Sequence, residues 1–169
     1  MDITKRKIWG VSDTHFNHAK MIHEFETSSR YGKFANIGEM NQLMIRNWNS
    51  VVADEDIVYH LGDVYMGNAA NAAELLGQLK GRKRLILGNH DDGKHEVLFR
   101  FFEKVMVSRI FKEFNAIMTH IPVHPDSLSP GKYGRNFHGH IHDRKIADPR
   151  YICLCVEQTN YFPVDLATL

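Results

Sequence analysis

The sequence predicts an α/β protein folded as a layered sandwich with a mixed sheet. In the first half of the chain, short apolar segments alternate with amphipathic helical patterns, and in the second half apolar segments follow one another. Strands that alternate with helices and then occur in succession are typical of such a sandwich. The length of 169 residues falls in the range of one domain, so we expect a single domain over residues 1–169.

Five apolar segments lead to residues of the types that bind metals or transfer protons. The segments KIWGVSDTH, DIVYHLGD, KRLILGNHD, NAIMTH and NFHGH lead in that order to Asp13, Asp63, Asn89, His120 and His140. We expect each segment to form a short buried strand. In open α/β sheets, ligands gather beyond the carboxyl ends of the strands, and these ends are therefore the expected site.

Two stretches have the apolar spacing of amphipathic helices, and a third stretch has it more weakly. The first helix is expected within residues 39–52 and the second within residues 68–81. For the second helix, Asn68 is the expected cap and Gly81 the expected stop. Residues 94–102 form the weaker candidate.

The remaining segments are predicted to be strands and one long loop. Residues 104–120 are expected to form consecutive strands, and residues 151–158 a late buried strand. Residues 120–136 are rich in Pro, Gly and Ser, and a loop of this length is either a wall of the functional pocket or a surface connection. Cys153 and Cys155 lie two positions apart in the late strand, which favours buried reduced thiols over a disulfide.

The composition gives no sign of a membrane protein, a secreted protein or a protein that binds nucleic acid through its overall charge. The formal net charge is +1, so no overall attraction to nucleic acid or to a membrane is expected. No apolar stretch has the length of a signal peptide or a membrane span. Together with reduced cysteines, this composition predicts a cytoplasmic protein without membrane contact. The eleven histidines are unusual and indicate a local site.

The residues at the strand ends form a metal-binding set of nitrogen and oxygen donors. The candidates are Asp13, His15, Asp63, Asn89, His90, His120, His140 and His142. Carboxylates, imidazoles and an amide without thiolates suit borderline divalent metals such as Mn, Fe, Co, Ni or Zn. The set is too large for one ion. Two ions that share a carboxylate are typical of sites for in-line displacement at phosphorus.

The order of these motifs resembles the signature of the calcineurin-like metallophosphoesterases. The blocks D-x-H, G-D, G-N-H-D, H and G-H-x-H fall at residues 13–15, 62–63, 88–91, 120 and 139–142. The resemblance is strongest to short, stand-alone bacterial and phage-encoded members. It implies a layered α/β-β-α sandwich with mixed sheets and the activity of a metal-dependent phosphoric ester hydrolase.

The resemblance also implies a role for each matching residue. The first ion is expected on Asp13, His15 and His142, the second on Asn89, His120 and His140, and both on Asp63. The implied cofactors are two divalent ions among Mn²⁺, Fe²⁺, Zn²⁺, Co²⁺ and Ni²⁺, with Mn²⁺ favoured. A hydroxide that bridges the metals would attack phosphorus directly, without a covalent intermediate. His90 is the expected general acid, and Asp91 is expected to orient its ring.

The other histidines receive weaker assignments. His18 and His124 are candidates for substrate binding, and His124 is also an alternative to His120 as a ligand. His60 and His138 are expected to be packed behind the ligands. Residues left as surface groups are His23, His95, Arg30, Lys132 and Arg135.

The sequence does not decide between two kinds of phosphoesterase, and it leaves a protein without catalytic activity as a further alternative. A phosphodiesterase is favoured because the leaving group of a diester needs a proton. A phosphomonoesterase of the same fold and, less favoured, a catalytically silent scaffold protein remain as alternatives. The expected partner is a phosphoester substrate such as a nucleotide or a nucleic-acid end.

Overall fold

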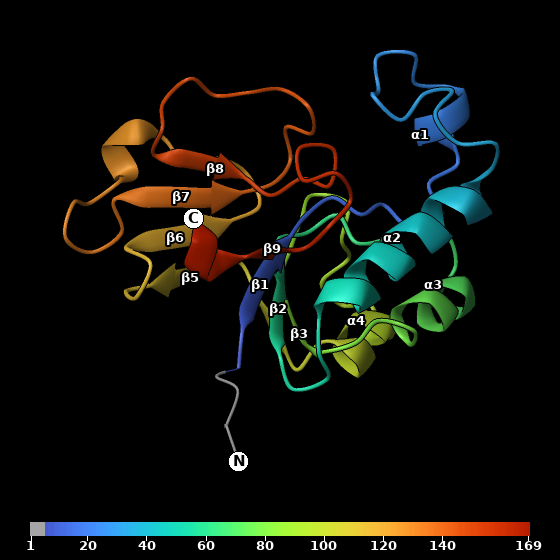
Figure 1. Cartoon of the computed structure of the whole chain (residues 1–169), viewed down its shortest axis with the longest axis horizontal. Helices are drawn as coiled ribbons and strands as arrows, with labels where there is room; N and C mark the ends of the chain where they lie inside the picture. The colour runs from blue at the N-terminus through green and yellow to red at the C-terminus, as the bar shows by residue number, and fades with distance from the viewer. Residues whose placement is uncertain (1–5) are drawn as a thin grey trace.

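Two β-sheets form the centre of the computed structural model, which describes residues 6–169 (Figure 1). The five-stranded sheet has the order β4-β3-β2-β1-β9, and the four-stranded sheet has the order β5-β6-β7-β8. The five-stranded sheet comprises β1 (Ile8–Val11), β2 (Ile57–His60), β3 (Arg82–Ile86), β4 (Lys104–Met106) and β9 (Val164–Asp165). The four-stranded sheet comprises β5 (Ser108–Phe111), β6 (Ala116–Thr119), β7 (Arg135–His138) and β8 (Tyr151–Cys153).

Both sheets mix parallel and antiparallel pairs, which confirms the α/β class and the mixed sheets expected from the sequence. In the five-stranded sheet β1 to β4 are parallel, and β9 runs antiparallel to β1. In the four-stranded sheet β5 is antiparallel to β6, whereas β6, β7 and β8 are parallel. The parallel strands align the carboxyl ends of neighbouring strands along one edge of each sheet.

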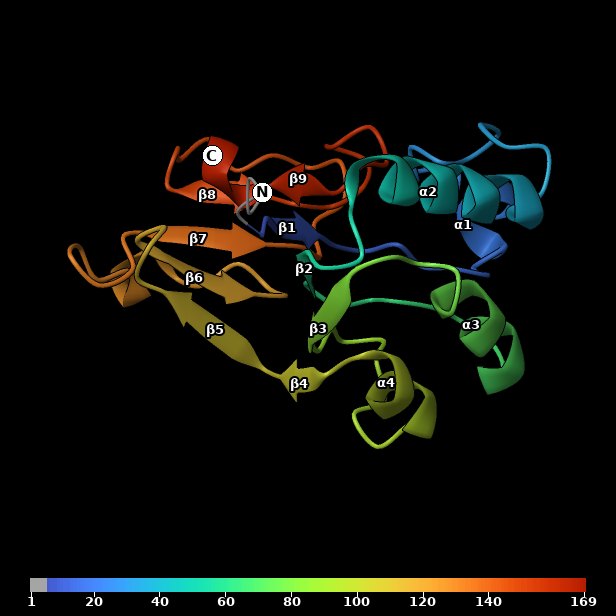
Figure 2. The ribbon, with the colours of Figure 1, turned by 60° about the horizontal axis from the view of Figure 1, so that its bottom comes forward.

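The α-helices lie together on one side of the five-stranded sheet, and the four-stranded sheet lies on its other side (Figures 1 and 2). They are α1 (Lys20–His23), α2 (Ile37–Val51), α3 (Ala69–Leu76) and α4 (Glu96–Phe101). Two 3-10 turns follow, η1 (Pro125–Ser127) and η2 (Leu166–Thr168). The three predicted helices are confirmed, and α1 was not expected. Within residues 6–169, no helix is long and apolar enough to cross a bilayer.

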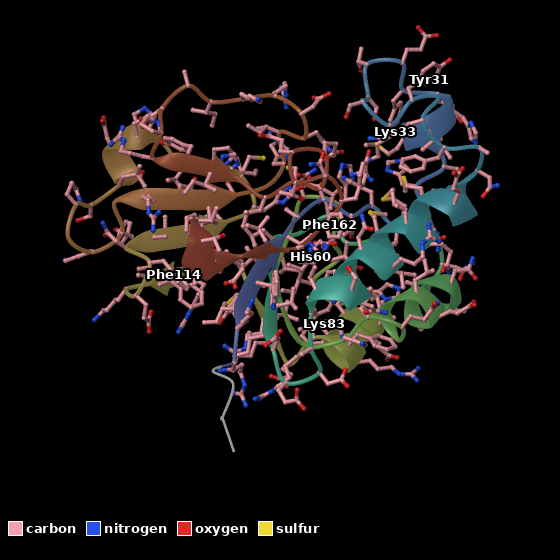
Figure 3. All side chains as sticks on the ribbon, in the orientation of Figure 1. Tyr31, Lys33, His60, Lys83, Phe114 and Phe162 are labelled. Atoms are coloured by element: carbon pink, nitrogen blue, oxygen red, sulfur yellow. The ribbon has the colours of Figure 1, made fainter. Side chains whose placement is uncertain are left out.

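Strand alternation sends the side chains of β2 into two separate apolar cores. Val58 points toward the helices, where it shares a core with Trp48 of α2 and Leu98 of α4. Tyr59 points the other way, into the core between the two sheets, and its ring meets Phe111 of β5 at 4.9 Å between centroids. Side chains therefore fill both spaces that the ribbon leaves between the layers (Figure 3).

Loop segments cover the outer face of the four-stranded sheet, because all the α-helices in the described part of the chain lie on the other sheet. Asn136 of β7 is buried on this outer face, and its Oδ1 accepts from the amide of Val123 at 3.0 Å. The Tyr151 hydroxyl donates to the carbonyl of Val123 at 2.6 Å. The loop after β6 is thus folded back where the resemblance implies a second helical layer.

Capping explains where the two longest helices begin. Asn36 caps α2 by accepting from the amide of Glu39 at 2.9 Å, and the Glu39 carboxylate accepts in return from the amide of Ala35. Asn68 caps α3 as predicted. The predicted stop is wrong, because α3 ends at Leu76 and Gly81 lies in the turn before β3 with φ +83°.

Candidate metal centre

The carboxyl ends of strands from both sheets meet at one place. The amide of Asp13 donates to the carbonyl of Gly62 at 3.0 Å, and the amide of Gly139 donates to the carbonyl of His120 at 2.9 Å. The two sheets are joined there because the amide of His140 donates to Asp13 Oδ2 at 2.9 Å. Residues from distant parts of the sequence therefore share one site at the end of both sheets.

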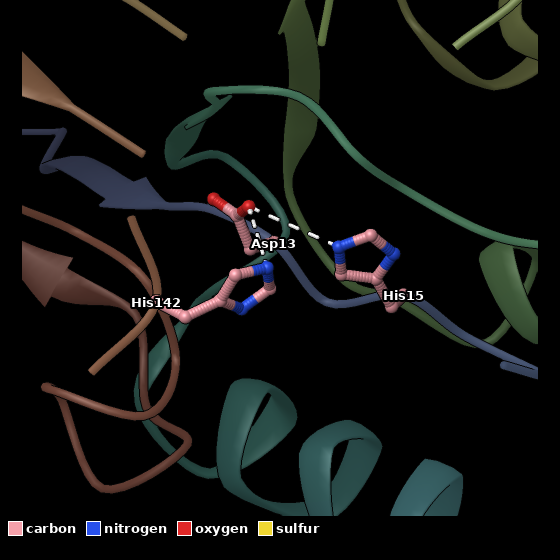
Figure 4. Close-up of side chains that lie close together, drawn as sticks. All are labelled: Asp13, His15 and His142. Carbon is pink, nitrogen blue, oxygen red and sulfur yellow. Dashed lines mark ion pairs between the residues drawn. The ribbon is translucent and has the colours of Figure 1, made fainter. Parts of the chain in front are cut away.

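Asp13, His15 and His142 form the first cluster. One ligand atom of each residue lies within 4.8 Å of the others, which is an arrangement that could hold a metal ion. Asp13 Oδ1 lies 3.9 Å from His15 Nε2 and 3.8 Å from His142 Nε2, and both rings point toward that carboxylate (Figure 4). Burial lowers the pKa of His15 well below its usual range, so its ring is neutral and suited to metal binding.

Asp63, His120 and His140 form the second cluster, with ligand atoms again within 4.8 Å of one another. Asn89 lies beside it, since its Oδ1 is 2.8 Å from His120 Nε2. His120 Nδ1 is 2.7 Å from the carbonyl of Leu61, which can only accept a hydrogen bond. Burial lowers the pKa of His120, but its contacts with Asp63 and Asp13 outweigh burial and the net shift is upward. With Nδ1 directed to the carbonyl of Leu61, Nε2 is the nitrogen that faces Asp63 and Asn89.

The carboxylate of Asp63 connects the two clusters. Its Oδ2 lies 3.5 Å from His15 Nε2 in the first cluster and 3.5 Å from His120 Nε2 in the second. Its Oδ1 accepts from the amide of His90 at 2.9 Å. Burial raises the pKa of Asp63, but the hydrogen bonds with His120 and His90 outweigh it, and the net shift is downward. One ionised side chain therefore faces both groups of donors.

Unpaired polar atoms and strained backbone indicate a ligand at these clusters. Within residues 6–169, Asp13 Oδ1 and both ring nitrogens of His15 are buried without a hydrogen-bond partner. Buried polar groups are normally paired, and nitrogen and oxygen donors of this kind are completed by a divalent cation. Positive φ angles, which are costly for residues with a Cβ, occur at Asp13, His15, Asp63, His140 and His142.

Glycine at two positions permits the close approach of these segments. Gly62 has φ +97°, and a Cβ there would lie 2.8 Å from His120 Nδ1 and would also collide with the backbone of Gly88. A Cβ at Gly139 would collide with Ser12 and Asp13. The glycines of the G-D and G-H-x-H motifs are thus needed because backbone and ligand side chains touch there.

Glu157 and Arg30 support the first cluster, and sequence reasoning missed both roles. Glu157 Oε1 lies 2.8 Å from His142 Nδ1, so the ring donates there and leaves Nε2 free to face Asp13. Arg30 is fully buried, pairs with Glu157 at 2.7 Å and donates to the carbonyl oxygens of Asp13 and Thr14. Burial raises the pKa of Glu157, but Arg30 and His142 together lower it to about 2.

Asp91 has a different role from the one predicted. Its carboxylate accepts from the amides of Asp63 at 2.9 Å, Val64 at 3.0 Å and Gly88 at 2.8 Å. The first two bonds tie the loop after β2 to the loop after β3, and the third lies within the loop after β3. Both oxygens are thereby occupied by backbone amides, so Asp91 positions the segment that carries Asp63 instead of orienting the ring of His90.

A cavity of about 630 Å³ opens beside the first cluster, and His90 and His18 line it together with His15 and His142. The ring of His90 is 5.6 Å from the ring of His15 between centroids, and the ring of His18 is 5.3 Å from it. His18 and His90 therefore border the space where a substrate would meet the clusters.

His124 is not brought to this site. Its side chain is 74% exposed, lies 3.7 Å from the carboxylate of Asp126 and caps η1. The loop that carries it covers the outer face of the four-stranded sheet, as described above. The structure therefore gives no support to His124 as a substrate-binding residue or as an alternative ligand.

Other predicted residues pack behind the clusters. His60 is buried, its Nδ1 accepts from the amide of Gly62 at 3.2 Å, and burial lowers its pKa to about 3. His138 is also buried, with Nδ1 2.9 Å from the carbonyl of Gly139. Both cysteines are free, as expected, and Cys155 Sγ donates to Asp13 Oδ2 at 3.2 Å.

The predicted surface residues have different outcomes. His23 and Lys132 are exposed as expected. His95 is partly buried at the cap of α4, with its ring 6.0 Å from that of Tyr65 between centroids. Arg135 donates to the carbonyl of Phe114, and the buried Arg30 contradicts the surface assignment most directly.

The comparison with known families decides the relationship that these motifs indicate. The pattern of the family described as Calcineurin-like phosphoesterase matches residues 6–161. The chain belongs to the calcineurin-like phosphoesterase family. Within this family, an uncharacterized protein of Methanocaldococcus jannaschii is 38% identical to the chain over 178 residues, with 97% of this chain and 89% of that protein covered.

Two further relatives of this calcineurin-like phosphoesterase match in part or in fold. The gene 66 protein of Mycobacterium phage L5 is 34% identical over 90 residues, which cover 52% of this chain and 40% of that protein. The crystal structure of a protein of unknown function from Aquifex aeolicus has a TM-score of 0.74 and 24% identity, with 97% of each chain covered. At this identity the likeness shows the fold.

Proposed function

We propose that this calcineurin-like phosphoesterase hydrolyses phosphodiesters with two divalent metal ions, of which Mn²⁺ is favoured. The observation that supports the proposal is the position of Asp63 Oδ2, 3.5 Å from an imidazole nitrogen of each cluster. In this proposal the first ion is held by Asp13, His15 and His142, the second by Asn89, His120 and His140, and both by Asp63. Bound cations would supply positive charge for the phosphoryl oxygens and a nucleophile from acidified water near neutral pH.

The residues of the chain orient the substrate and deliver a proton. His90 is exposed at the cavity, and its amide is fixed to Asp63 Oδ1 at 2.9 Å, so its ring stays close to the clusters. From this position His90 donates a proton to the leaving oxygen, and His18 beside it contacts the phosphate. The alkoxide that an alkyl phosphodiester releases needs such a donor, and His90 therefore supports the phosphodiesterase in this proposal.

Turnover of bis(p-nitrophenyl) phosphate with added Mn²⁺ tests the proposal. We expect the wild type to hydrolyse this diester faster than p-nitrophenyl phosphate, and the Asp63→Asn variant to lose at least a hundredfold in kcat/KM. Asp148→Asn is the matched control, because Asp148 pairs with Arg150 away from the clusters. Equal rates for wild type and Asp63→Asn would reject the enzyme and leave a scaffold. A faster monoester reaction would favour a phosphatase.

A further inference from the structure

The cavity beside the first cluster extends well beyond the candidate ligands. One end is formed by the imidazoles of His15, His18, His90 and His142, and the rest is formed by other kinds of residue. With a volume of about 630 Å³, the space is much larger than a phosphate group needs. The organic part of a phosphoester therefore has a place to bind, and its lining indicates what that part is.

Part of the cavity wall is apolar and carries one accessible aromatic ring. Met21, Phe25, Met66 and Ile141 line this wall. Phe25 is 42% exposed, and its ring stands edge-on to that of His18 at 5.7 Å between centroids. An aromatic ring that is left accessible beside a binding site offers a face on which a planar group can stack.

Arg30 ties the segment that carries Phe25 and Ser28 to the first cluster. Its guanidinium group donates to the carbonyl oxygens of Asp13 and Thr14, while its amide donates to Ser28 Oγ at 3.2 Å. The amide of Ser28 in turn donates to the carbonyl of Phe25 at 2.8 Å. These bonds hold the backbone of residues 25–30 beside the first cluster, so the segment that carries the Phe25 ring is in place before a ligand binds.

Polar groups also line the cavity, and they favour a heterocycle over an acyl chain as the organic part of the substrate. The polar lining residues are Ser28, Ser29, Asp143 and Arg144. The Nε of Arg144 donates to the carbonyl of Ile141 at 3.3 Å, which holds the guanidinium group at the rim. An acyl chain would make no use of these donors and acceptors, whereas a nucleobase has polar edges around an apolar face.

The charge of the lining indicates a small ligand. Among the described residues that line the cavity, Arg144 is the only Lys or Arg, and Asp143 lies next to it. A long nucleic acid is bound through many phosphate contacts with basic side chains, which this lining does not provide. A mononucleotide or dinucleotide needs only the contacts around the metal clusters.

We propose that the substrate is a small nucleotide ester whose base stacks on Phe25 while its phosphate lies at His90 and the two clusters. This inference rests on the phosphodiesterase function proposed above and adds the substrate class. The base lies against Met21, Phe25 and Ile141, and its polar edge faces Ser28 and Arg144.

Binding of two ligands that differ only in the base tests the inference. We expect the Mn²⁺-loaded protein to bind adenosine 5′-monophosphate at least tenfold more tightly than ribose 5-phosphate in isothermal titration calorimetry. Phe25→Ala should weaken binding of the nucleotide about tenfold, the size of one base–aromatic contact, and leave ribose 5-phosphate unchanged. Phe25→Tyr should retain tight binding. Phe99→Ala is the matched control, because Phe99 is 57% exposed on α4 outside this cavity.

The outcomes separate this inference from the proposed function. Equal affinities for the two ligands, or an unchanged nucleotide affinity in Phe25→Ala, would overturn the base site even if the diester is hydrolysed. Failure of both ligands to bind would overturn it as well. Tight, Phe25-dependent nucleotide binding without turnover of any diester would support the base site and reject hydrolysis.

Discussion

Glu157 determines which nitrogen of His142 faces the first cluster. Its carboxylate accepts a hydrogen bond from His142 Nδ1 at 2.8 Å, so Nε2 is the nitrogen directed to Asp13 and to any metal there. Partners of this kind orient ligand imidazoles and make them better donors. A side chain that does not itself reach the metal position thereby controls the geometry of one that does.

Replacement of Glu157 by Gln should weaken metal binding without removing a proposed ligand. We expect the affinity for Mn²⁺ to fall about 10- to 100-fold, because the neutral amide no longer fixes the Nδ1–H form of His142. Competition with a fluorescent chelator measures this affinity. Glu103→Gln is the control, since Glu103 loses a surface pair with Arg82 only. Equal affinities for the two variants would show that Glu157 has no influence on the metal.

His90 is not one of the proposed metal ligands. Its ring borders the cavity, and only its backbone amide bonds to Asp63. We expect His90→Ala to slow hydrolysis of alkyl phosphodiesters by about 10²- to 10⁴-fold, the usual size of general acid catalysis. Nitrophenyl esters should be affected far less, since nitrophenolate leaves without a proton. Steady-state rates for both ester types measure the difference, and equal losses would exclude the acid role.

At the scale of the elements, the loops after β1, β2, β3, β6 and β7 carry the site. Their backbone bends sharply where the ligands lie, and candidate ligands such as Asp13, Asp63 and His140 have positive φ angles there. Asp91 adds two hydrogen bonds between two of these loops, to the amides of Asp63 and Val64. The strands hold the loops in place, and the loops hold the ligands in conformations that cost free energy.

A comparison of two glycines with similar φ angles distinguishes the cost of backbone strain from the cost of a crowded Cβ atom. Gly62 has φ +97° and Gly67 has φ +91°, but a Cβ would be crowded only at Gly62. We expect Gly67→Ala to lower the free energy of unfolding by about 1–2 kcal/mol through the left-handed backbone alone. Gly62→Ala should lose about 1–3 kcal/mol more and bind less Mn²⁺. Urea unfolding and metal stoichiometry measure both effects, and equal losses of stability would contradict the crowding.

The elements were largely predictable from the sequence, because strands and long helices leave local signals. The apolar runs that lead to Asp13 and Asp63 form β1 and β2, and the cap of α3 at Asn68 follows from a local hydrogen bond. The end of α3 was misplaced, since the sequence offers both Gly77 and Gly81 as stops and the structure caps the helix at Gly77.

Contacts between distant residues limited the prediction of the site. The motifs identified the candidate ligands, and the two clusters contain six of them in the expected groups. Arg30 and Glu157 are 127 positions apart, and nothing local shows that they pair. Glu157 does follow the apolar run of residues 151–156, so the rule used for the other strand ends would have selected it.

At the scale of the whole molecule, the candidate ligands are divided between the two sheets. Asp13, Asp63 and Asn89 follow strands of the five-stranded sheet, whereas His120, His140 and His142 follow strands of the four-stranded sheet. On the proposed assignment, each ion takes donors from both sheets. Bound metal should therefore stabilise the contact between the sheets as well as the loops.

Removal of metal should lower the melting temperature. For one site at a hundredfold excess of free metal over Kd, the stabilisation is about 2.7 kcal/mol. For a chain of this size that corresponds to roughly 5–10 °C. We expect differential scanning calorimetry to show this decrease when EDTA replaces Mn²⁺. Asp63→Asn should lose most of the difference and Asp148→Asn should keep it. A melting temperature that is independent of metal would contradict the shared site.

The division of the donors between the sheets also sets the order in which the site is completed during synthesis. A nascent chain that has emerged as far as β4 carries Asp13, Asp63 and Asn89 but none of the imidazoles that follow β6 and β7. On the proposed assignment, such a chain holds an incomplete pair of sites. Capture of both ions therefore comes late in maturation, when the second sheet has docked on the first, and early fragments would bind metal weakly.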